Sequence, residues 1–183
     1  MLVLSPRAVA RLESYNPPWP MPKTYRMKKD GKLVEGIFQG DTINTPSMLC
    51  VEDYLDALKW AERIGGLPAL IRRSDDNVGV LANWIERGGW ARFLATSPAI
   101  RSNTSVCLKI ADPWFEGLSK DAQSAAAVKI ASLLEKEGVG LDLGGYRAAP
   151  PGLRIWCGAT VETSDVEALI PWLDWAYAEV KQG

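Results

Sequence analysis

The chain has 183 residues, of which 47% are hydrophobic, and its formal net charge is −1. This composition can build a buried core, and it argues against a nucleic-acid or anionic-membrane surface, since both need clustered positive charge. The sequence contains no histidine, which excludes Ser-His and Cys-His catalysis and histidine metal sites. Its three cysteines form no zinc or redox motif, so we expect reduced thiols in a cytosolic protein. No apolar run is long enough for a transmembrane helix.

The first 40 residues predict one helix among short extended segments. Met1–Leu4 is wholly apolar and predicts a buried strand. The Ser-Pro pair at residues 5–6 favours the start of a helix that ends near Ser14, because serine caps helices and proline suits their first turn. The four prolines within Asn16–Pro22 exclude a helix there. Two short strands are expected on either side of a turn, at Thr24–Met27 and Leu33–Val34.

Two long helices are expected next. Thr45 as N-cap, followed by a proline, predicts a helix that runs to about Ile64, where two glycines end it. Leu67 to about Arg87 predicts the second helix. A helix N-terminus with nearby amide and hydroxyl groups can bind an anion, but most such ends bind nothing. Taken alone, Asn44 and Thr45 are therefore a weak signal.

The remaining sequence alternates predicted strands and helices. Ser119 is expected to cap a helix that ends near Glu137. Thr163–Asp165 offers cap side chains to a last helix that runs to about Lys181, with a kink expected at Pro171. Three strands are expected, at Trp90–Ala95, Asn103–Ile110 and, more weakly, Val139–Leu143.

The stretch from Tyr146 to Asp165 carries the chemically most informative residues. Leu153–Cys157 alternates apolar side chains and predicts a half-buried strand, with Arg154 on its other face and Arg147 in the loop before it. A guanidinium stays charged and grips a carboxylate or phosphate with two hydrogen bonds. Composition alone favours a simpler interpretation, in which Arg154 is an edge-strand residue paired with a surface acid.

Several motifs together resemble the phosphoserine aminotransferases, which are fold-type-I enzymes dependent on pyridoxal phosphate. These motifs are MLVLSPRAV, INTPSM, WAERIGG, RSNTSVCLKI and PPGLRIWCGATVETSDVEALIPWLDW, together with the Gly-Tyr-Arg loop before Gly-Leu-Arg. The resemblance covers only the C-terminal half of such an enzyme. It implies an α/β fold in which residues 1–66 complete the large cofactor-binding domain and residues 67–183 form a small α+β domain.

The resemblance also implies roles for particular residues. Arg154 would bind the substrate α-carboxylate, and Arg147 with Tyr146 would bind the distal phosphate or carboxylate, from either subunit of a homodimer. Tyr146 stands where many relatives have histidine, which leaves its contribution open. Asn44 and Thr45 would bind the phosphate of pyridoxal 5′-phosphate held by the partner subunit. The Schiff-base lysine is expected upstream of residue 1, in the N-terminal half, so this chain alone is expected to be inactive.

The implied reaction exchanges an amino group between glutamate and 3-phosphohydroxypyruvate, the 2-oxo acid of phosphoserine, in serine biosynthesis. One alternative is another fold-type-I transaminase that uses glyoxylate or pyruvate, although a second arginine would then lack an anionic partner. The other alternative is a non-enzymatic α+β interaction domain, in which the arginines and the eight tryptophans form only a protein interface.

Overall fold

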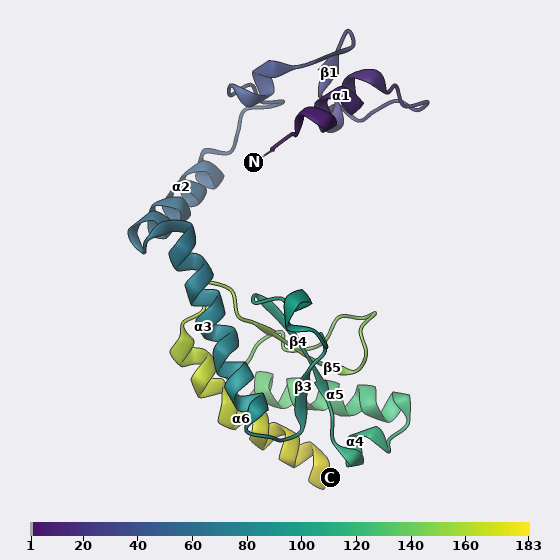
Figure 1. The fold of residues 1–183 in the computed structure, drawn as a ribbon, viewed down its shortest axis with the longest axis vertical. Helices are drawn as coiled ribbons and strands as arrows, with labels where there is room; N and C mark the ends of the chain where they lie inside the picture. Colours follow the sequence, from purple (N-terminus) through teal and green to yellow (C-terminus); the bar gives the residue numbers. More distant parts are fainter. Residues whose placement is uncertain (1) are drawn as a thin grey trace. The chain divides into compact units, whose positions relative to one another are not determined.

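The computed structural model describes residues 2–183, and the chain divides into two compact units, Met1–Lys59 and Trp60–Gly183 (Figure 1). Both units combine helices with antiparallel strands, and the expected α/β class is confirmed. The assignment of residues 1–66 to a larger cofactor-binding domain and of residues 67–183 to a small domain stays a prediction.

The first unit consists of short elements and has no buried residue within residues 2–59. Helix α1, Pro6–Ser14, begins as predicted, and Ser5 Oγ accepts a hydrogen bond from the Ala8 amide at 3.2 Å. The predicted strand at Met1–Leu4 is wrong for residues 2–4, which have no regular structure and leave Val3 84% exposed. No strand of this unit pairs with these residues, so their apolar character alone does not make them a strand. Met1 lies outside the described residues.

A two-stranded hairpin follows α1. Strands β1, Lys28–Lys29, and β2, Lys32–Leu33, pair antiparallel. The turn between them uses Asp30 and Gly31, both with positive φ angles of 51° and 78°. The predicted turn is confirmed, but the expected strand at Thr24–Met27 is wrong, because Lys23–Tyr25 forms the 3₁₀ helix η1. A second 3₁₀ helix, η2, spans Glu35–Phe38.

Helix α2, Met48–Arg63, begins two residues later than predicted. Ser47 Oγ accepts the capping hydrogen bond from the Cys50 amide at 3.5 Å, so the prediction of Thr45 as N-cap is wrong. Ser47 provides an equally good cap two residues further along the chain, so the local sequence alone does not decide between the two starts. Gly65, with φ of 110°, separates α2 from the next helix, as expected.

The second unit contains a three-stranded sheet and three long helices. The expected strand at Val139–Leu143 is wrong, because this segment forms only turns and a loop, and an isolated bridge joins Gly144 to Leu153. The two glycines that follow it, Gly144 and Gly145, favour a turn over a paired strand. The elements of this unit are α3 (Gly66–Glu86), β3 (Ala91–Phe93), η3 (Pro98–Ile100), β4 (Ser105–Ile110), α4 (Pro113–Glu116), α5 (Lys120–Lys136), β5 (Gly152–Trp156) and α6 (Thr163–Gln182).

The sheet has the order β3-β4-β5, and both pairs of strands are antiparallel. Val106, Leu108 and Ile110 of β4 are buried, while Ser105, Cys107 and Lys109 alternate with them on the other face. Arg154 of β5 lies opposite Cys107, so it belongs to this second, outer face. The predicted alternation at Leu153, Ile155 and Cys157 is confirmed, because all three are buried.

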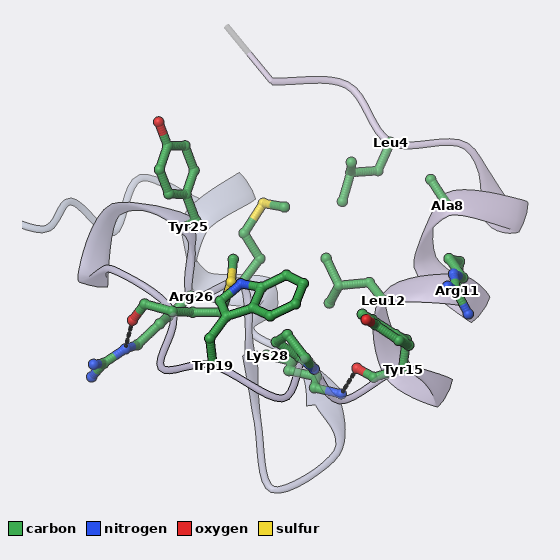
Figure 2. Close-up of a pocket in the computed structure, with 12 residues that line it drawn as sticks. Leu4, Ala8, Arg11, Leu12, Tyr15, Trp19, Tyr25, Arg26 and Lys28 are labelled. Atoms are coloured by element: carbon green, nitrogen blue, oxygen red, sulfur yellow. Dashed lines mark hydrogen bonds between the residues drawn. The ribbon is translucent and has the colours of Figure 1, made fainter.

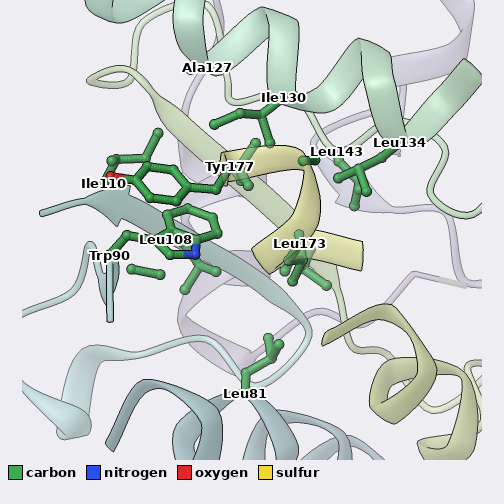
Figure 3. Packing of buried hydrophobic residues seen from close by; sticks show 14 of the residues in the cluster. Leu81, Trp90, Leu108, Ile110, Ala127, Ile130, Leu134, Leu143, Leu173 and Tyr177 are labelled. Carbon is green, nitrogen blue, oxygen red and sulfur yellow. The ribbon is translucent and has the colours of Figure 1, made fainter. Parts of the chain in front are cut away.

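A single apolar core joins the inner face of this sheet to α3, α5 and α6. Figure 3 shows Leu108 of β4, Ile130 and Leu134 of α5 and Leu173 of α6 among the side chains of this core. Trp90 stacks on Tyr177 with ring centroids 4.5 Å apart, and it donates a hydrogen bond to Asp174 at 2.9 Å. Trp84 donates to the same carboxylate. These two tryptophans therefore belong to the core of the second unit. Within residues 2–183, no helix combines the length and apolarity needed to span a bilayer.

Candidate functional site

Arg154 extends from the middle of β5, an edge strand of the sheet. Its backbone amide donates a hydrogen bond to Leu143 O at 2.9 Å, which ties the strand to the loop that precedes it. The side chain is 19% exposed and reaches the side chains of two loop residues, Asp142 and Tyr146. A guanidinium on a strand has a well-defined backbone position, which is what bidentate recognition of an anion requires.

The guanidinium is already paired with a carboxylate. Arg154 Nη2 donates to Asp142 Oδ2 and, at 3.4 Å, to Asp142 O. The hydrogen bond that Arg154 donates to Asp142 raises the pKa of Arg154. This ion pair agrees with the simpler interpretation of the sequence, in which Arg154 is an edge-strand residue paired with a surface acid. That pairing does not test the predicted role of Arg154 toward a substrate, because the same group can bind either carboxylate.

Tyr146 covers the guanidinium of Arg154. Its ring centroid lies 4.8 Å from Arg154 Cζ, within the range of a cation–π interaction. Its hydroxyl oxygen lies 3.1 Å from Ser105 Oγ, and the two groups share a hydrogen bond. Ser105 therefore joins the loop to the outer face of the sheet. A phenol in this position stacks on the arginine and remains 55% exposed.

Arg147 lies beside a different hollow. It is exposed, and it lines a cavity of about 210 Å³ together with Ser124 and Val128 of α5 and Pro150 of the loop. Tyr146 lines this cavity as well, whereas Arg154 does not. The structure thus brings Tyr146 close to Arg154 but places Arg147 at the α5 side of the same loop.

Asn44 and Thr45 lie in the first unit, in the loop before α2. Both are exposed, and within residues 2–183 their side chains accept or donate no hydrogen bond. Their amide and hydroxyl groups are chemically suited to a phosphate, and they are accessible. In ligand type, these residues fit the phosphate end of the expected cofactor.

The first unit also contains a larger apolar hollow of about 850 Å³. Figure 2 shows Leu4, Ala8, Leu12 and Trp19 around it. At its margin, Lys28 Nζ donates a hydrogen bond to Tyr15 O at 2.6 Å (Figure 2). Its lining is mostly apolar, although Arg11, Arg26 and Lys28 also line it.

Sequence reasoning missed Asp142 and Ser105. Asp142 has a φ of 55°, a left-handed conformation that aspartate tolerates better than most residues. The sequence predicted a strand at residues 139–143, and no local pattern indicated which side chain the carboxylate of Asp142 would contact. Ser105 was recognisable as an outward residue of its strand, but its tyrosine partner lies 41 positions away.

Comparison with known proteins identifies relatives along almost the whole chain. The phosphoserine aminotransferase of Methanosarcina barkeri is 52% identical over 181 residues, which are 99% of this chain and 46% of the relative. The phosphoserine aminotransferase of Methanosarcina mazei is 51% identical over the same shares. The chain is related to the phosphoserine aminotransferases. It fits their C-terminal half, as its motifs indicated, and it spans about half the length of these relatives. No family model matches the sequence.

Solved structures of phosphoserine aminotransferases share the fold. The enzyme from Bacillus circulans subsp. alkalophilus has a TM-score of 0.60 and 23% identity, covering 76% of this chain and 35% of that one. A phosphoserine aminotransferase studied for radiation damage of its Schiff base has a TM-score of 0.65 and 15% identity, covering 84% of this chain and 40% of that one. At these identities the likeness concerns the fold, which is that of a fold-type-I pyridoxal-phosphate enzyme.

Proposed function

We propose that this chain is the C-terminal portion of a phosphoserine aminotransferase that moves an amino group between glutamate and 3-phosphohydroxypyruvate in serine biosynthesis. The strongest support for this proposal is the 52% identity to the M. barkeri enzyme over 99% of this chain. The geometry supports it, because Arg154 is held on the outer face of the sheet by a strand and by Tyr146. Neither a pyruvate-type transaminase nor an interaction domain is favoured by these relatives.

The chain's own residues would bind and orient the substrate. Arg154 would grip the α-carboxylate that every amino-acid substrate carries, and Tyr146 would keep the guanidinium in place by stacking on it. Arg147 would attract the distal phosphate or carboxylate from its position beside α5. Asn44 and Thr45 would donate hydrogen bonds to the phosphate of pyridoxal 5′-phosphate, which, when bound, supplies the electron-withdrawing chemistry of amino transfer.

The lysine that holds the cofactor is proposed to lie in the N-terminal half of the enzyme. Within the described residues, every lysine except Lys28 is exposed to solvent. The Lys28 ammonium is engaged by two backbone carbonyls, Glu13 O at 3.2 Å and Tyr15 O at 2.6 Å. A reactive amine needs a desolvated pocket beside its substrate, which these positions do not offer. The complete enzyme would be a homodimer in which Asn44 and Thr45 serve the partner subunit's cofactor.

A chimeric enzyme tests the proposal. This chain replaces the matching segment of the M. barkeri relative, and formation of phosphoserine from 3-phosphohydroxypyruvate and glutamate is measured. We expect amino transfer, with pyruvate and glyoxylate as much poorer acceptors. The matched control carries Arg154→Gln in the same chimera and should lose activity toward all acceptors. A folded, cofactor-loaded chimera that prefers pyruvate, or that transfers no amino group, would contradict the assignment.

A further inference from the structure

The ion pair between Asp142 and Arg154 joins two groups of very different mobility. Arg154 is on a strand, and its side chain is 19% exposed, whereas the Asp142 side chain is 81% exposed on a loop. Asp142 has a φ of 55°, a conformation that aims its short side chain toward the strand. Its carboxylate is the same chemical group that a substrate would present to this guanidinium.

The pairing leaves part of the guanidinium unsatisfied. Both contacts to Asp142 are made by Nη2, while Arg154 Nε is buried and has no hydrogen-bond partner within the described residues. A carboxylate that bound in fork fashion would use two guanidinium nitrogens. An exposed ion pair with one bonded nitrogen is weak, whereas a bidentate pair at a half-buried guanidinium is stronger. The contact to Asp142 is therefore suited to being exchanged for a better one.

We propose that Asp142 is an internal competitor, whose carboxylate occupies the anion position of Arg154 until the carboxylate of a substrate displaces it. This inference rests on the proposed function, because it takes Arg154 as the substrate-carboxylate residue. Asp142 would then set the affinity of the site. It would neutralise the guanidinium between turnovers, and it would swing into solvent when the substrate binds.

In the alternative role, Asp142 only positions Arg154. The two roles predict opposite changes in the affinity for a carboxylate when Asp142 is replaced. Removal of a competitor strengthens the binding of a carboxylate, whereas removal of a positioning residue weakens it. Asp142→Asn is the informative variant, because asparagine tolerates the left-handed backbone and loses only the charge. Asp142→Gly provides a second variant that accepts the same backbone if asparagine still bonds to the arginine.

The experiment titrates the chain with acetate at constant ionic strength and follows the arginine Nε–Hε signals by NMR. Arg154→Gln identifies the signal of Arg154. The matched control is Asp30→Asn, since Asp30 also has a positive φ, and within the described residues it forms no ion pair. We expect Asp142→Asn and Asp142→Gly to bind acetate about two- to fivefold more tightly than the unaltered chain, and Asp30→Asn to bind it equally.

An unchanged or weakened affinity in both Asp142 variants would overturn the inference, as would the absence of any acetate effect on the Arg154 signal. These outcomes are separable from failure of the proposed function. An active chimera, combined with an unchanged acetate affinity in the Asp142 variants, would contradict only the competitor role. Tighter acetate binding in the variants, combined with a folded chimera that transfers no amino group, would leave the competitor in place and remove the aminotransferase assignment.

Discussion

Asn77 of α3 and Thr163, the first residue of α6, are joined by a hydrogen bond of 2.8 Å from Thr163 Oγ1 to Asn77 Oδ1. The Asn77 side chain is fully buried, and its Nδ2 also donates to Cys157 O at 3.2 Å and to Val161 O at 3.0 Å. One turn earlier, Arg73 Nε donates to Ala159 O at 2.6 Å. Two side chains of α3 therefore hold the connection between β5 and α6.

Replacing Asn77 by alanine should destabilise the chain by about 2–4 kcal/mol, because several buried carbonyls and a hydroxyl lose their partner at once. Asn83→Ala is the matched control, since Asn83 lies on the same helix and is exposed; its effect should stay within about 0.5 kcal/mol. Urea unfolding followed by tryptophan fluorescence measures both free energies. Equal effects in the two variants would show that the Asn77 hydrogen bonds contribute little.

Gly152 opens the strand that carries Arg154, and it lies against the neighbouring strand. A Cβ atom at this position would lie 2.1 Å from Leu108 O, so Gly152→Ala should force β5 away from β4 and destabilise the fold by about 2 kcal/mol or more. Gly79→Ala is the control, because no atom lies within 4 Å of a Cβ at this position in α3. It should stabilise the helix by about 0.5–1 kcal/mol. Thermal unfolding of the two variants should therefore shift in opposite directions.

Arg154 and Arg147 should divide the recognition of substrate in the chimeric enzyme. Arg154→Lys keeps the charge but loses the planar fork, so kcat/KM should fall on the order of 30- to 1000-fold for glutamate and phosphoserine alike. Arg147→Lys should raise KM for phosphoserine far more than for alanine, which has no distal charge. The measured quantity is the ratio of kcat/KM for phosphoserine to that for alanine. The same ratio in both variants would contradict the division of roles.

The buried thiol of Cys157 should resist modification in the folded chain. Cys157 is completely inaccessible, and burial raises its pKa to about 11, so little thiolate exists at neutral pH. Cys50 is exposed and serves as the internal comparison. A chromogenic disulfide reagent at about pH 8, with peptide mapping, should label Cys50 quickly and Cys157 only after denaturant is added. Labelling of Cys157 at the rate of Cys50 would be inconsistent with this core.

The ion pair between Asp112 and Lys181 should make stability depend on acid pH. Lys181 Nζ lies 3.0 Å from Asp112 Oδ2, and its hydrogen bond lowers the pKa of Asp112 in the folded chain. The unfolded chain therefore takes up a proton at higher pH, so the stabilisation is present above that pKa and lost as the pH falls through the folded value. Because the pair is partly exposed, it should contribute at most about 1 kcal/mol.

Lys181→Met tests this dependence. The difference in unfolding free energy between this variant and the unaltered chain should shrink as the pH falls from about 6 to about 2. Lys129→Met is the control, because Lys129 is exposed and forms no ion pair within the described residues. A difference for Lys181→Met that does not change with pH would exclude the ion pair as its cause.

Local signals in the sequence were sufficient for most helices and for the strand of Arg154. The serine caps of α1 and α5, the Gly65-Gly66 break and the alternation at Leu153, Ile155 and Cys157 all correspond to the structure. These features depend on residues that are close together along the chain, so the sequence shows them directly. The strand predicted from the apolar run at Met1–Leu4 was wrong for residues 2–4. A strand needs a neighbouring strand to pair with, and the local sequence does not show whether one is present.

The sequence by itself determined the family resemblance, the fold class and the identity of the arginine on the strand. Only the tertiary structure decided what surrounds that arginine. Asp142 lies 12 positions before Arg154, and the Ser105 hydroxyl that bonds Tyr146 lies 41 positions before its partner. These contacts arise from sheet register and from the path of a loop, and both follow from packing across the whole unit. Charge and spacing along the chain therefore marked Arg154, whereas the competitor beside it became visible only in three dimensions.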